Sequence, residues 1–249
     1  MALNPTARHY AAATAAYEAG RPGYPAALLA ALPLDSAACV VDLGAGTGKL
    51  TRLLAPRLAP GTRLIAVEPV AGMSAKLADV PAVEIVNARA DDTGLPDGCA
   101  DVVVCAQSFH WFDDEAAVAE IRRLLVPGGT LALMWNMRDE RVEWVDALSK
   151  MIEAHAGDTP RHQTGRWRWV LDDPRFAFDQ QIVVKHPHRM ARDGVFERVA
   201  STSYIAGLPD VDRQRLRERT EAILREAGLG DAETVVLPYL SRLFLLTRR

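Results

Sequence analysis

An acidic residue and three glycines stand close together in the segment VDLGAGTGK at residues 41–49. The segment begins in a short apolar run, so a strand would lead into a turn whose backbone N–H groups a ligand can approach without obstruction by Cβ atoms. A dinucleotide-binding fingerprint would place a further glycine at position 49, where this chain has Lys49. Asp42 would repel a pyrophosphate, but its charge suits a cationic sulfonium or amino group.

A second acid, Glu68, follows the next apolar run, roughly twenty residues after the glycines. A carboxylate at that place can accept hydrogen bonds from the ribose hydroxyls of nicotinamide or adenosyl cofactors. Alternatively, the glycines form only a tight turn and Glu68 is a solvated loop acid. Because both features fall in register within one strand–helix–strand unit, we favour a nucleoside-binding site.

Polar and aromatic residues also follow two later apolar runs, which end near Ala106 and Trp135. Ligands of open α/β sheets bind outside the carboxyl ends of the strands, so these side chains should line the place where a substrate binds. The expected substrate-binding residues are Ser108, His110, Trp111, Trp135, Asn136 and Arg138, with Gln107 beside them.

His110 is the candidate catalytic base if the substrate reacts through a phenol, an alcohol or an amine, because an imidazole titrates near neutral pH. A substrate that reacts through a carboxylate needs no base, and His110 would then orient that substrate. A third interpretation is that His110 only caps its turn against Trp111.

Strand and helix patterns alternate regularly through the first half of the chain. This alternation predicts a doubly wound, mostly parallel sheet of the α/β class. Helices are expected at residues 25–32, 71–77, 114–125 and 210–227, with an interrupted helix at 50–58. Strands are expected at residues 39–43, 63–67, 83–86, 102–106, 130–135, 181–185 and 235–246.

We expect one domain over residues 1–249, divided into four parts. An N-terminal helical flap (1–36), with a short helix before the loop at 21–25, precedes a cofactor-binding core (37–136), a helical lid (137–177) and C-terminal elements that complete the sheet (178–249). Three tryptophans of the lid would either roof an apolar substrate or pack into a small core of the lid itself; they are Trp144, Trp167 and Trp169.

Composition narrows the classes of partner. Apolar residues make up 49% of the 249 residues and charged residues 24%, which is ordinary for a globular protein. The formal net charge of -3 disfavours nucleic acid as the main partner. No signal peptide, membrane span or metal-ligand spacing is evident, and the three cysteines form no CxxC pair, so we expect a cytoplasmic, metal-free monomer or homodimer.

Four segments resemble the successive motifs of class I S-adenosylmethionine-dependent methyltransferases: VVDLGAGTGKLT, the VEP that follows, LPDGCADVV and LLVPGGTLAL. The chain is similar in particular to the small-molecule branch that includes trans-aconitate methyltransferase-like enzymes (the methyltransferase domain 11 type). That similarity lies in YEAGRPGYP, AQSFHWFDD, LMWNMRD and STSYIAGLP. The resemblance implies a seven-stranded Rossmann-like sheet, S-adenosylmethionine as the cofactor and S-adenosylhomocysteine as its product.

The resemblance also implies roles for individual residues. Asp42 and the turn would hold the methionine part of the cofactor, Glu68 the ribose, and either Asp91 or Asp92 the adenine amino group. The N-terminal segment with Arg21 and Tyr24 would fold over the cofactor, where Arg21 could clamp a carboxylate as a catalytic residue. The cofactor-binding residues implied are Tyr24, Asp42, Gly44, Ala45, Gly46, Thr47, Gly48, Glu68, Pro69, Met73, Ala90, Asp91 and Gln107.

We therefore expect methyl transfer to a small molecule, by O-methylation of a carboxylate or hydroxyl, with N- or C-methylation as further options. Two alternatives remain open: a protein of the same fold that binds S-adenosylmethionine without transferring its methyl group, and a nicotinamide-dependent oxidoreductase. Methylation of nucleic acid or protein is disfavoured by the near-neutral charge.

Overall fold

The computed structural model describes residues 20–249, so the first part of the expected flap, with its short helix, lies outside the described residues. The described chain forms two compact units. Unit 1 comprises residues 20–22, 136–159 and 185–240, and unit 2 comprises residues 23–135, 160–184 and 241–249. The chain passes between the units at five points: two outside helices and strands, at residues 22–23 and 159–160, and three inside the strands Leu125–Arg138, Phe176–Ala191 and Thr234–Arg248.

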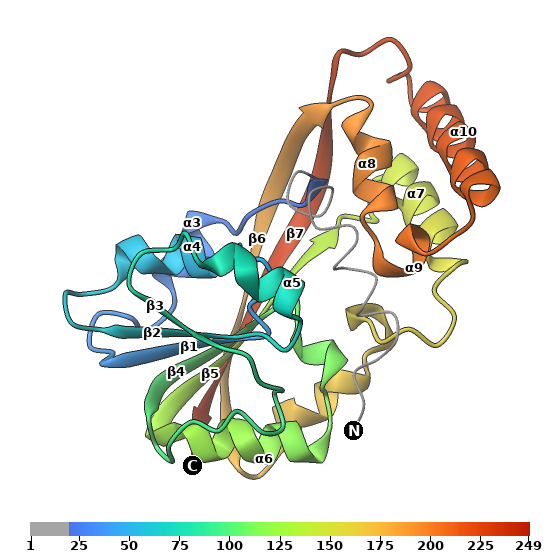
Figure 1. Ribbon diagram of the computed structural model, residues 1–249. Coiled ribbons are helices and arrows are strands. Elements are labelled where there is room, and N and C mark those ends of the chain that lie inside the picture. Colours follow the sequence, from blue (N-terminus) through green and yellow to red (C-terminus); the bar gives the residue numbers. More distant parts are fainter. Residues whose placement is uncertain (1–19) are drawn as a thin grey trace. The chain divides into compact units, whose positions relative to one another are not determined.

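The elements closely match the expected ones in the first half of the chain (Figure 1). The strands are β1 (Cys39–Leu43), β2 (Arg63–Val67), β3 (Val83–Val86), β4 (Ala100–Ala106), β5 (Leu125–Arg138), β6 (Phe176–Ala191) and β7 (Thr234–Arg248). The α-helices are α3 (Ala26–Ala30), α4 (Thr51–Leu54), α5 (Ala71–Ser74), α6 (Glu115–Leu124), α7 (Glu143–Glu153), α8 (Gly194–Ala200), α9 (Ser203–Ala206) and α10 (Asp210–Glu226). Short 3-10 turns are η1 (Ala55–Arg57), η2 (Ala75–Leu77), η3 (Phe109–Trp111), η4 (His162–Thr164) and η5 (Arg166–Asp172).

The sheet has the strand order β3-β2-β1-β4-β5-β7-β6. The pairs from β3 to β5 are parallel, and every residue of the central strand β1 is buried, because helices cover both faces of a parallel sheet. In unit 2, α3 and α4 lie on one face and α6 on the other (Figure 1). The order reverses at β1 and β4, which is where such sheets bind ligands.

β7 is antiparallel to β6. Thr247 near the end of β7 donates to Asp179 near the start of β6, and the Arg249 N–H donates to the Arg175 carbonyl. Both pairs join the end of one strand to the beginning of the other. The expected seven-stranded, mostly parallel sheet is therefore confirmed, with β7 as its reversed strand.

The expectation that Pro127-Gly128-Gly129 separates a helix from a strand beginning at Thr130 was wrong in one respect. β5 already starts at Leu125, and its pairing with β4 shifts between Ala100 and Val102, so the proline and glycines form a bulge inside the strand. A Cβ on Gly129 would lie 2.9 Å from the Val126 carbonyl oxygen, which explains a glycine there.

Unit 1 has its own apolar core. Helices α7, α8 and α10 contribute buried Val, Leu, Ile and Phe side chains, and β7 contributes Val235, Leu237 and Tyr239. Trp144 packs against this core, whereas Trp167 is buried in unit 2 with only 1% of its surface exposed. Trp167 packs there with Trp135 of β5 and Phe244 of β7, and therefore not in a separate core of the lid. No helix within residues 20–249 is long and apolar enough to cross a membrane.

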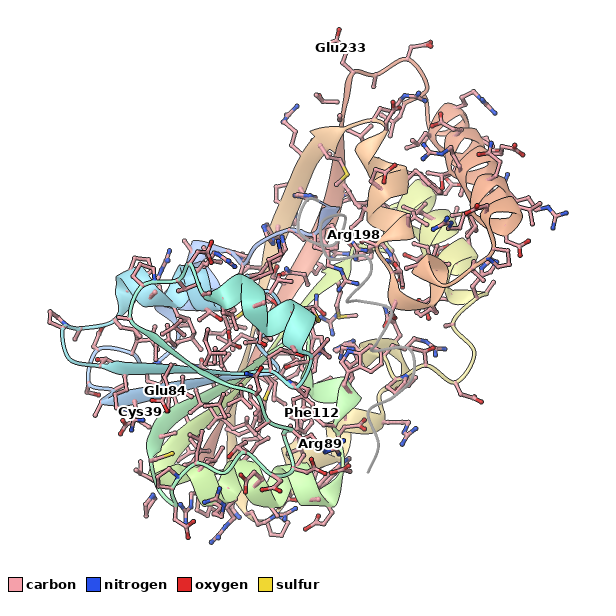
Figure 2. The ribbon with its side chains drawn as sticks, in the orientation of Figure 1. Cys39, Glu84, Arg89, Phe112, Arg198 and Glu233 are labelled. Atoms are coloured by element: carbon pink, nitrogen blue, oxygen red, sulfur yellow. The ribbon has the colours of Figure 1, made fainter. Side chains whose placement is uncertain are left out.

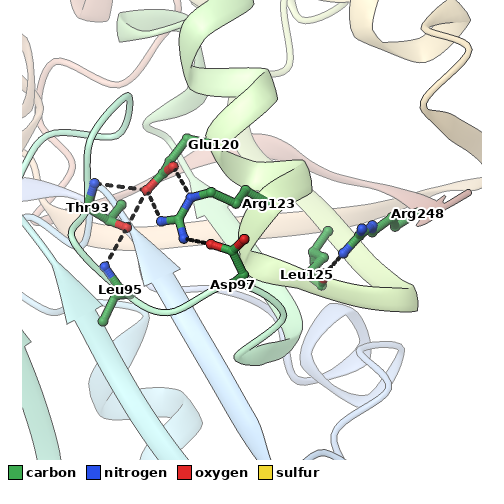
Figure 3. A network of polar contacts seen from close by, with 7 residues as sticks. All are labelled: Thr93, Leu95, Asp97, Glu120, Arg123, Leu125 and Arg248. Atoms are coloured by element: carbon green, nitrogen blue, oxygen red, sulfur yellow. Dashed lines mark hydrogen bonds and ion pairs between the residues drawn. The ribbon is translucent and has the colours of Figure 1, made fainter.

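An ion-pair network with a buried Glu120 at its centre and an exposed Asp97 at its end fastens the loop before β4 to α6 in unit 2 (Figure 3). Glu120 accepts hydrogen bonds from the Thr93 N–H and hydroxyl and is paired with Arg123, which also reaches Asp97. The charge of Arg123 and the bonds from Thr93 lower the pKa of the Glu120 carboxyl to about 2, against the effect of burial. Nearby, Arg248 of β7 donates to the Leu125 carbonyl at the start of β5.

The substitution Glu120→Gln should lower the free energy of unfolding at pH 7 by about 1–3 kcal/mol, because the network loses its central charge. A carboxyl with a lowered folded-state pKa stabilises above its unfolded pKa, near 4.5, and loses that contribution as the pH falls toward 2. The difference between variant and wild type should therefore shrink below pH 4.5, as measured by urea unfolding from pH 7 to pH 3. Glu226→Gln, at an exposed ion pair, is the control and should change stability by less than about 0.5 kcal/mol. A constant Glu120→Gln deficit at every pH would contradict the prediction.

Candidate active site

The glycine turn joins the carboxyl end of β1 to the segment before α4, and its conformation requires glycine. Gly44 and Gly48 have φ values of 74° and 85°, in the left-handed region. A Cβ on Gly44 would lie 2.6 Å from the Ser108 Cβ, and one on Gly48 would collide with the Leu77 Cδ2. The Gly44 and Ala45 N–H groups donate to the Val67 carbonyl at the end of β2. The turn thus exposes backbone without Cβ atoms at its glycines, and it lies at the carboxyl end of the central strand β1.

Glu68 holds the turn from the neighbouring strand. One carboxylate oxygen accepts the Gly46 N–H and the other accepts the Val70 N–H, each at 2.9 Å, and only 6% of the residue surface is exposed. Burial raises the pKa of this carboxyl above its usual value. Glu68 is therefore not the solvated loop acid of the alternative interpretation. Each oxygen still has a second lone pair with which it could accept a ligand hydroxyl.

Asp42 is the more unusual acid of the site. One oxygen accepts the Thr51 hydroxyl at 2.6 Å, while Oδ1 is buried with no hydrogen-bond partner among the described residues. Burial raises the pKa of the Asp42 carboxyl to about 7, and the negative charge of Glu68 adds to this effect. The Thr47 hydroxyl in the turn is likewise buried without a partner in the described part of the chain.

A ligand with a cationic or N–H donor group would satisfy Asp42 Oδ1, and the bare backbone of the turn leaves room for it to approach. The donor set therefore fits the amino-acid end of S-adenosylmethionine, as expected from the sequence. Within residues 20–249, no cluster of three or more His, Cys, Asp or Glu side chains could hold a metal ion.

The predicted adenine-side residues lie on or after β2 and β3. Met73 is buried, with a methyl group that would lie 3.3 Å from a Cβ on Gly46, and Ala90 is also buried. Asp91 accepts two hydrogen bonds of 2.8 Å from Arg89, whose guanidinium lowers the pKa of that carboxyl. Arg89 is labelled in Figure 2. Asp92 is exposed. The prediction that either Asp91 or Asp92 contacts the adenine amino group therefore stays open between the two residues.

The segment after β4 lies directly against the turn. Gln107 has a φ of 57°, a strained value for a residue with a side chain, and its N–H donates to the Met134 carbonyl. The hydroxyl of Ser108 donates to the Leu43 carbonyl at 2.7 Å and is buried. This contact holds Ser108 beneath the turn, and its predicted contact with substrate stays a prediction. The Phe112 ring, labelled in Figure 2, would also meet a Cβ on Gly44.

His110 and Trp135 form a pair in unit 2. The Trp135 indole N–H donates to His110 Nδ1 at 3.2 Å, so a neutral His110 carries its proton on Nε2. Trp135 is fully buried, with its ring centroid 4.4 Å from that of Trp167 and 4.7 Å from that of His162. Trp135 therefore packs in the core of unit 2 and donates a hydrogen bond to His110, and its predicted contact with substrate stays a prediction.

His162 is packed within this aromatic group. Both of its ring nitrogens are buried without a hydrogen-bond partner in the described part of the chain. Burial, aided by the charges of Arg242 and Arg168, lowers the pKa of His162 to about 4. The ring is therefore neutral at pH 7 and packs as an aromatic residue. The spacing of His162 in the sequence gave no signal of this role.

The other predicted residues divide between the units. Tyr24 packs on the core of unit 2 that α3 and α4 cover, and Trp111 lies beside His110 in η3. Arg21, Asn136 and Arg138 belong to unit 1. There the Asn136 amide donates to the Pro22 carbonyl, and Arg138 donates to the Ser149 hydroxyl. Thr51, the partner of Asp42, was not among the residues that the sequence singled out.

The reversed seventh strand, the glycine turn after β1 and the acid after β2 define a Rossmann-like nucleoside-binding fold of the methyltransferase type. Residues 41–133 match the family model described as a methyltransferase domain. Over 234 residues the chain is 36% identical to an uncharacterized methyltransferase of Mycobacterium tuberculosis, covering 93% of this chain and 92% of the relative. The chain therefore belongs to the class I S-adenosylmethionine-dependent methyltransferases.

Two further comparisons agree with this family. A trans-aconitate 2-methyltransferase of Paracidovorax citrulli is 36% identical over 132 residues, which is 52% of this chain and 50% of that protein. A solved structure of an Anaeromyxobacter dehalogenans protein, assigned as a type II methyltransferase, superposes with a TM-score of 0.70 at 26% identity, covering 92% of this chain and 97% of that one. The resemblance expected from the motifs is thus confirmed.

The substitution Asp42→Asn should make the unliganded protein more stable at pH 8, because it removes a buried charge. A carboxyl whose pKa is raised from 3.8 to about 7 costs stability progressively as the pH rises between those values, and the full cost is present above pH 7. The gain over wild type, measured by urea unfolding, should shrink as the pH is lowered from 8 to 4. Asp79→Asn, at an exposed acid, is the matched control. If Asp42→Asn were less stable than wild type by the same amount throughout, burial of a charge at this position would be disproved.

Proposed function

We propose that the chain transfers a methyl group from S-adenosylmethionine to an oxygen atom of a small-molecule acceptor. The observation that supports this most directly is Asp42, whose buried Oδ1 has no hydrogen-bond partner among the described residues, beside a turn of bare backbone. A buried carboxylate of this kind is stabilised by a bound cation or amine.

S-Adenosylmethionine supplies a methyl group that is activated for transfer by the positive charge on its sulfur. On this chain, Asp42 and the turn at residues 44–48 would hold its methionine part, with Gln107 alongside. Glu68 would accept the ribose hydroxyls through the lone pairs that the Gly46 and Val70 N–H groups leave open. Pro69, Met73, Ala90 and one of the acids at 91 and 92 would border the adenine.

The hydrogen bond from Trp135 bears on the kind of acceptor. With Nδ1 accepting this bond, a neutral His110 presents an N–H at Nε2, which can donate to an acceptor but cannot take its proton. This favours an acceptor that is already ionised, such as a carboxylate, over a hydroxyl that must lose its proton. The similarity to a trans-aconitate 2-methyltransferase supports the same choice.

The first test is thermal unfolding with S-adenosylmethionine, S-adenosylhomocysteine, NADH or NADPH. We expect stabilisation by the two adenosyl ligands alone, of about 2.7 kcal/mol at a hundred times the dissociation constant. The double variant Asp42→Ala, Glu68→Ala should lose this stabilisation, and the control Asp79→Asn should keep it. Stabilisation by a nicotinamide cofactor only would favour the oxidoreductase.

Transfer is then measured as S-adenosylhomocysteine formed when acids, trans-aconitate among them, or phenols and amines are supplied. Acceptor-dependent formation with an acid supports the proposal. Binding of the cofactor without turnover on any acceptor in this panel would instead favour a protein that binds it without transferring methyl groups.

The substitution His110→Phe should lower kcat/KM for the acceptor by about tenfold or more, because a hydrogen-bond donor is lost. His110→Gln should retain more activity, since its amide N–H can also donate. The rate of the wild type should not rise with a histidine-like ionisation between pH 6 and 8, because no base is needed. His155→Gln, an exposed position after α7, is the control. A rising pH profile that His110→Gln abolishes would assign His110 as a base instead.

A further inference from the structure

Arg52 is the second residue of α4 and lies beside the glycine turn in unit 2. Its Nη1 donates to the Thr47 carbonyl of the turn. Its Nη2 donates to the Lys76 carbonyl of η2 and, at 2.7 Å, to the carboxylate of Asp79. One guanidinium therefore joins the turn that follows β1 to the helical segment that follows β2.

The peptide unit between Thr47 and Gly48 is held at both of its ends. Its carbonyl accepts the bond from Arg52, and its N–H donates to the Ala45 carbonyl at 3.0 Å. A Cβ on Gly48 would lie 3.0 Å from the Arg52 Nη1, so the guanidinium lies directly against this glycine. Because Gly48 has no side chain that could restrict its backbone, the bond from Arg52 limits the rotation of this peptide unit.

The segment formed by α5 and η2 is fixed to the turn at both of its ends. At its beginning, Glu68 accepts the N–H groups of Gly46 and Val70. At its end, Arg52 bridges the turn and η2. Between these two contacts, the methyl group of Met73 would lie 3.3 Å from a Cβ on Gly46. The spacing between the turn and the segment is thus set from both ends.

The proposed function divides the cofactor between these two elements. The turn would hold its methionine part, whereas Glu68, Pro69 and Met73 would border its ribose and adenine. A ligand that binds both elements at once gains affinity when their spacing already matches its length, because the protein then need not be ordered at the moment of binding. A residue that fixes this spacing therefore contributes to the affinity for the whole cofactor.

We propose that Arg52 is a positioning residue, which holds the methionine-binding turn and the adenosine-binding segment at the separation that S-adenosylmethionine spans. It acts through the Thr47 and Lys76 carbonyls, and the planar guanidinium suits this role because its N–H groups have fixed directions. The bond to Asp79 contributes little, since the Asp79 side chain is 72% exposed. The link to the cofactor rests on the proposed function, but the hold on the turn does not.

The first test is isothermal titration of the full chain with S-adenosylhomocysteine, which spans both elements, and with adenosine, which lacks the methionine part. Arg52→Gln should bind S-adenosylhomocysteine about tenfold more weakly, because the spacing is no longer fixed. Its affinity for adenosine should change by less than about threefold, since Glu68 still holds the adenosine-binding segment. Arg52→Lys should lie between Arg52→Gln and the wild type, because an ammonium lacks the planar fork.

Two control variants isolate the contacts to the carbonyls. Arg57→Gln removes the same charge from an exposed position in η1, where Arg57 donates to the Leu53 carbonyl. Asp79→Asn removes the exposed ion pair and leaves the carbonyl contacts of Arg52 in place. Both should bind S-adenosylhomocysteine as the wild type does. Equal affinity in Arg52→Gln and Arg57→Gln, or an equal loss for S-adenosylhomocysteine and adenosine, would overturn the proposal.

Hydrogen exchange of the unliganded protein tests the hold on the turn without any cofactor. The Gly48 N–H donates to the Ala45 carbonyl and the Gly46 N–H to Glu68, so the peptide covering residues 44–48 should exchange faster in Arg52→Gln. A peptide from β4 should exchange as in the wild type, which separates a local effect from general unfolding. Unchanged exchange at residues 44–48 would show that Arg52 does not hold the turn. Should Arg52→Gln not fold, both tests are made on Arg52→Lys, where smaller differences of the same kind are expected.

The outcome can be told apart from that of the proposed function. If the wild type binds no adenosyl ligand, the proposed function fails, and the exchange rates at residues 44–48 still decide whether Arg52 holds the turn. If S-adenosylhomocysteine binds equally well with and without Arg52, the cofactor assignment stands and the positioning role fails.

Discussion

Two carboxylates, Asp42 and Glu68, are buried at the carboxyl ends of adjacent parallel strands, where water cannot solvate them. Glu68 offsets this cost by accepting two N–H groups, and in doing so it fixes the glycine turn to β2. For Asp42, the cost of burial is offset on one oxygen only, by the hydrogen bond from the Thr51 hydroxyl. Ser108 and Leu77 pack closely against Gly44 and Gly48 of the turn, and Glu68 holds the Gly46 N–H between them.

Much of unit 2 could be predicted because its signals are local. The apolar runs of β1, β2 and β3 and the glycine turn are each set by a few consecutive residues, and the structure reproduces the three strand boundaries. The bulge at residues 127–129 could not be predicted, since proline and glycines usually end an element. Whether they interrupt a strand depends on its pairing with β4, which lies outside any short window of sequence.

The site was predictable where a role follows from position in a strand–turn–helix unit, as for Asp42 and Glu68. It was not predictable where a role depends on packing between distant segments. Trp135 looked available to a ligand, but its ring is buried against His162 and Trp167. These two residues lie 27 and 32 positions further along the chain. Arg52 lies 24 positions before Lys76, and only the fold brings its guanidinium to that carbonyl.

The contact between Trp135 and His110 has an optical consequence. An indole held in a dry environment emits at short wavelength, and a neighbouring imidazole quenches that emission more strongly once it is protonated. Because the Trp135 N–H donates to the ring nitrogen of His110 that would have to take up a proton, the two events are chemically linked. Protonation of His110 at that nitrogen would break the hydrogen bond and change the emission of Trp135, one of five tryptophans in the chain.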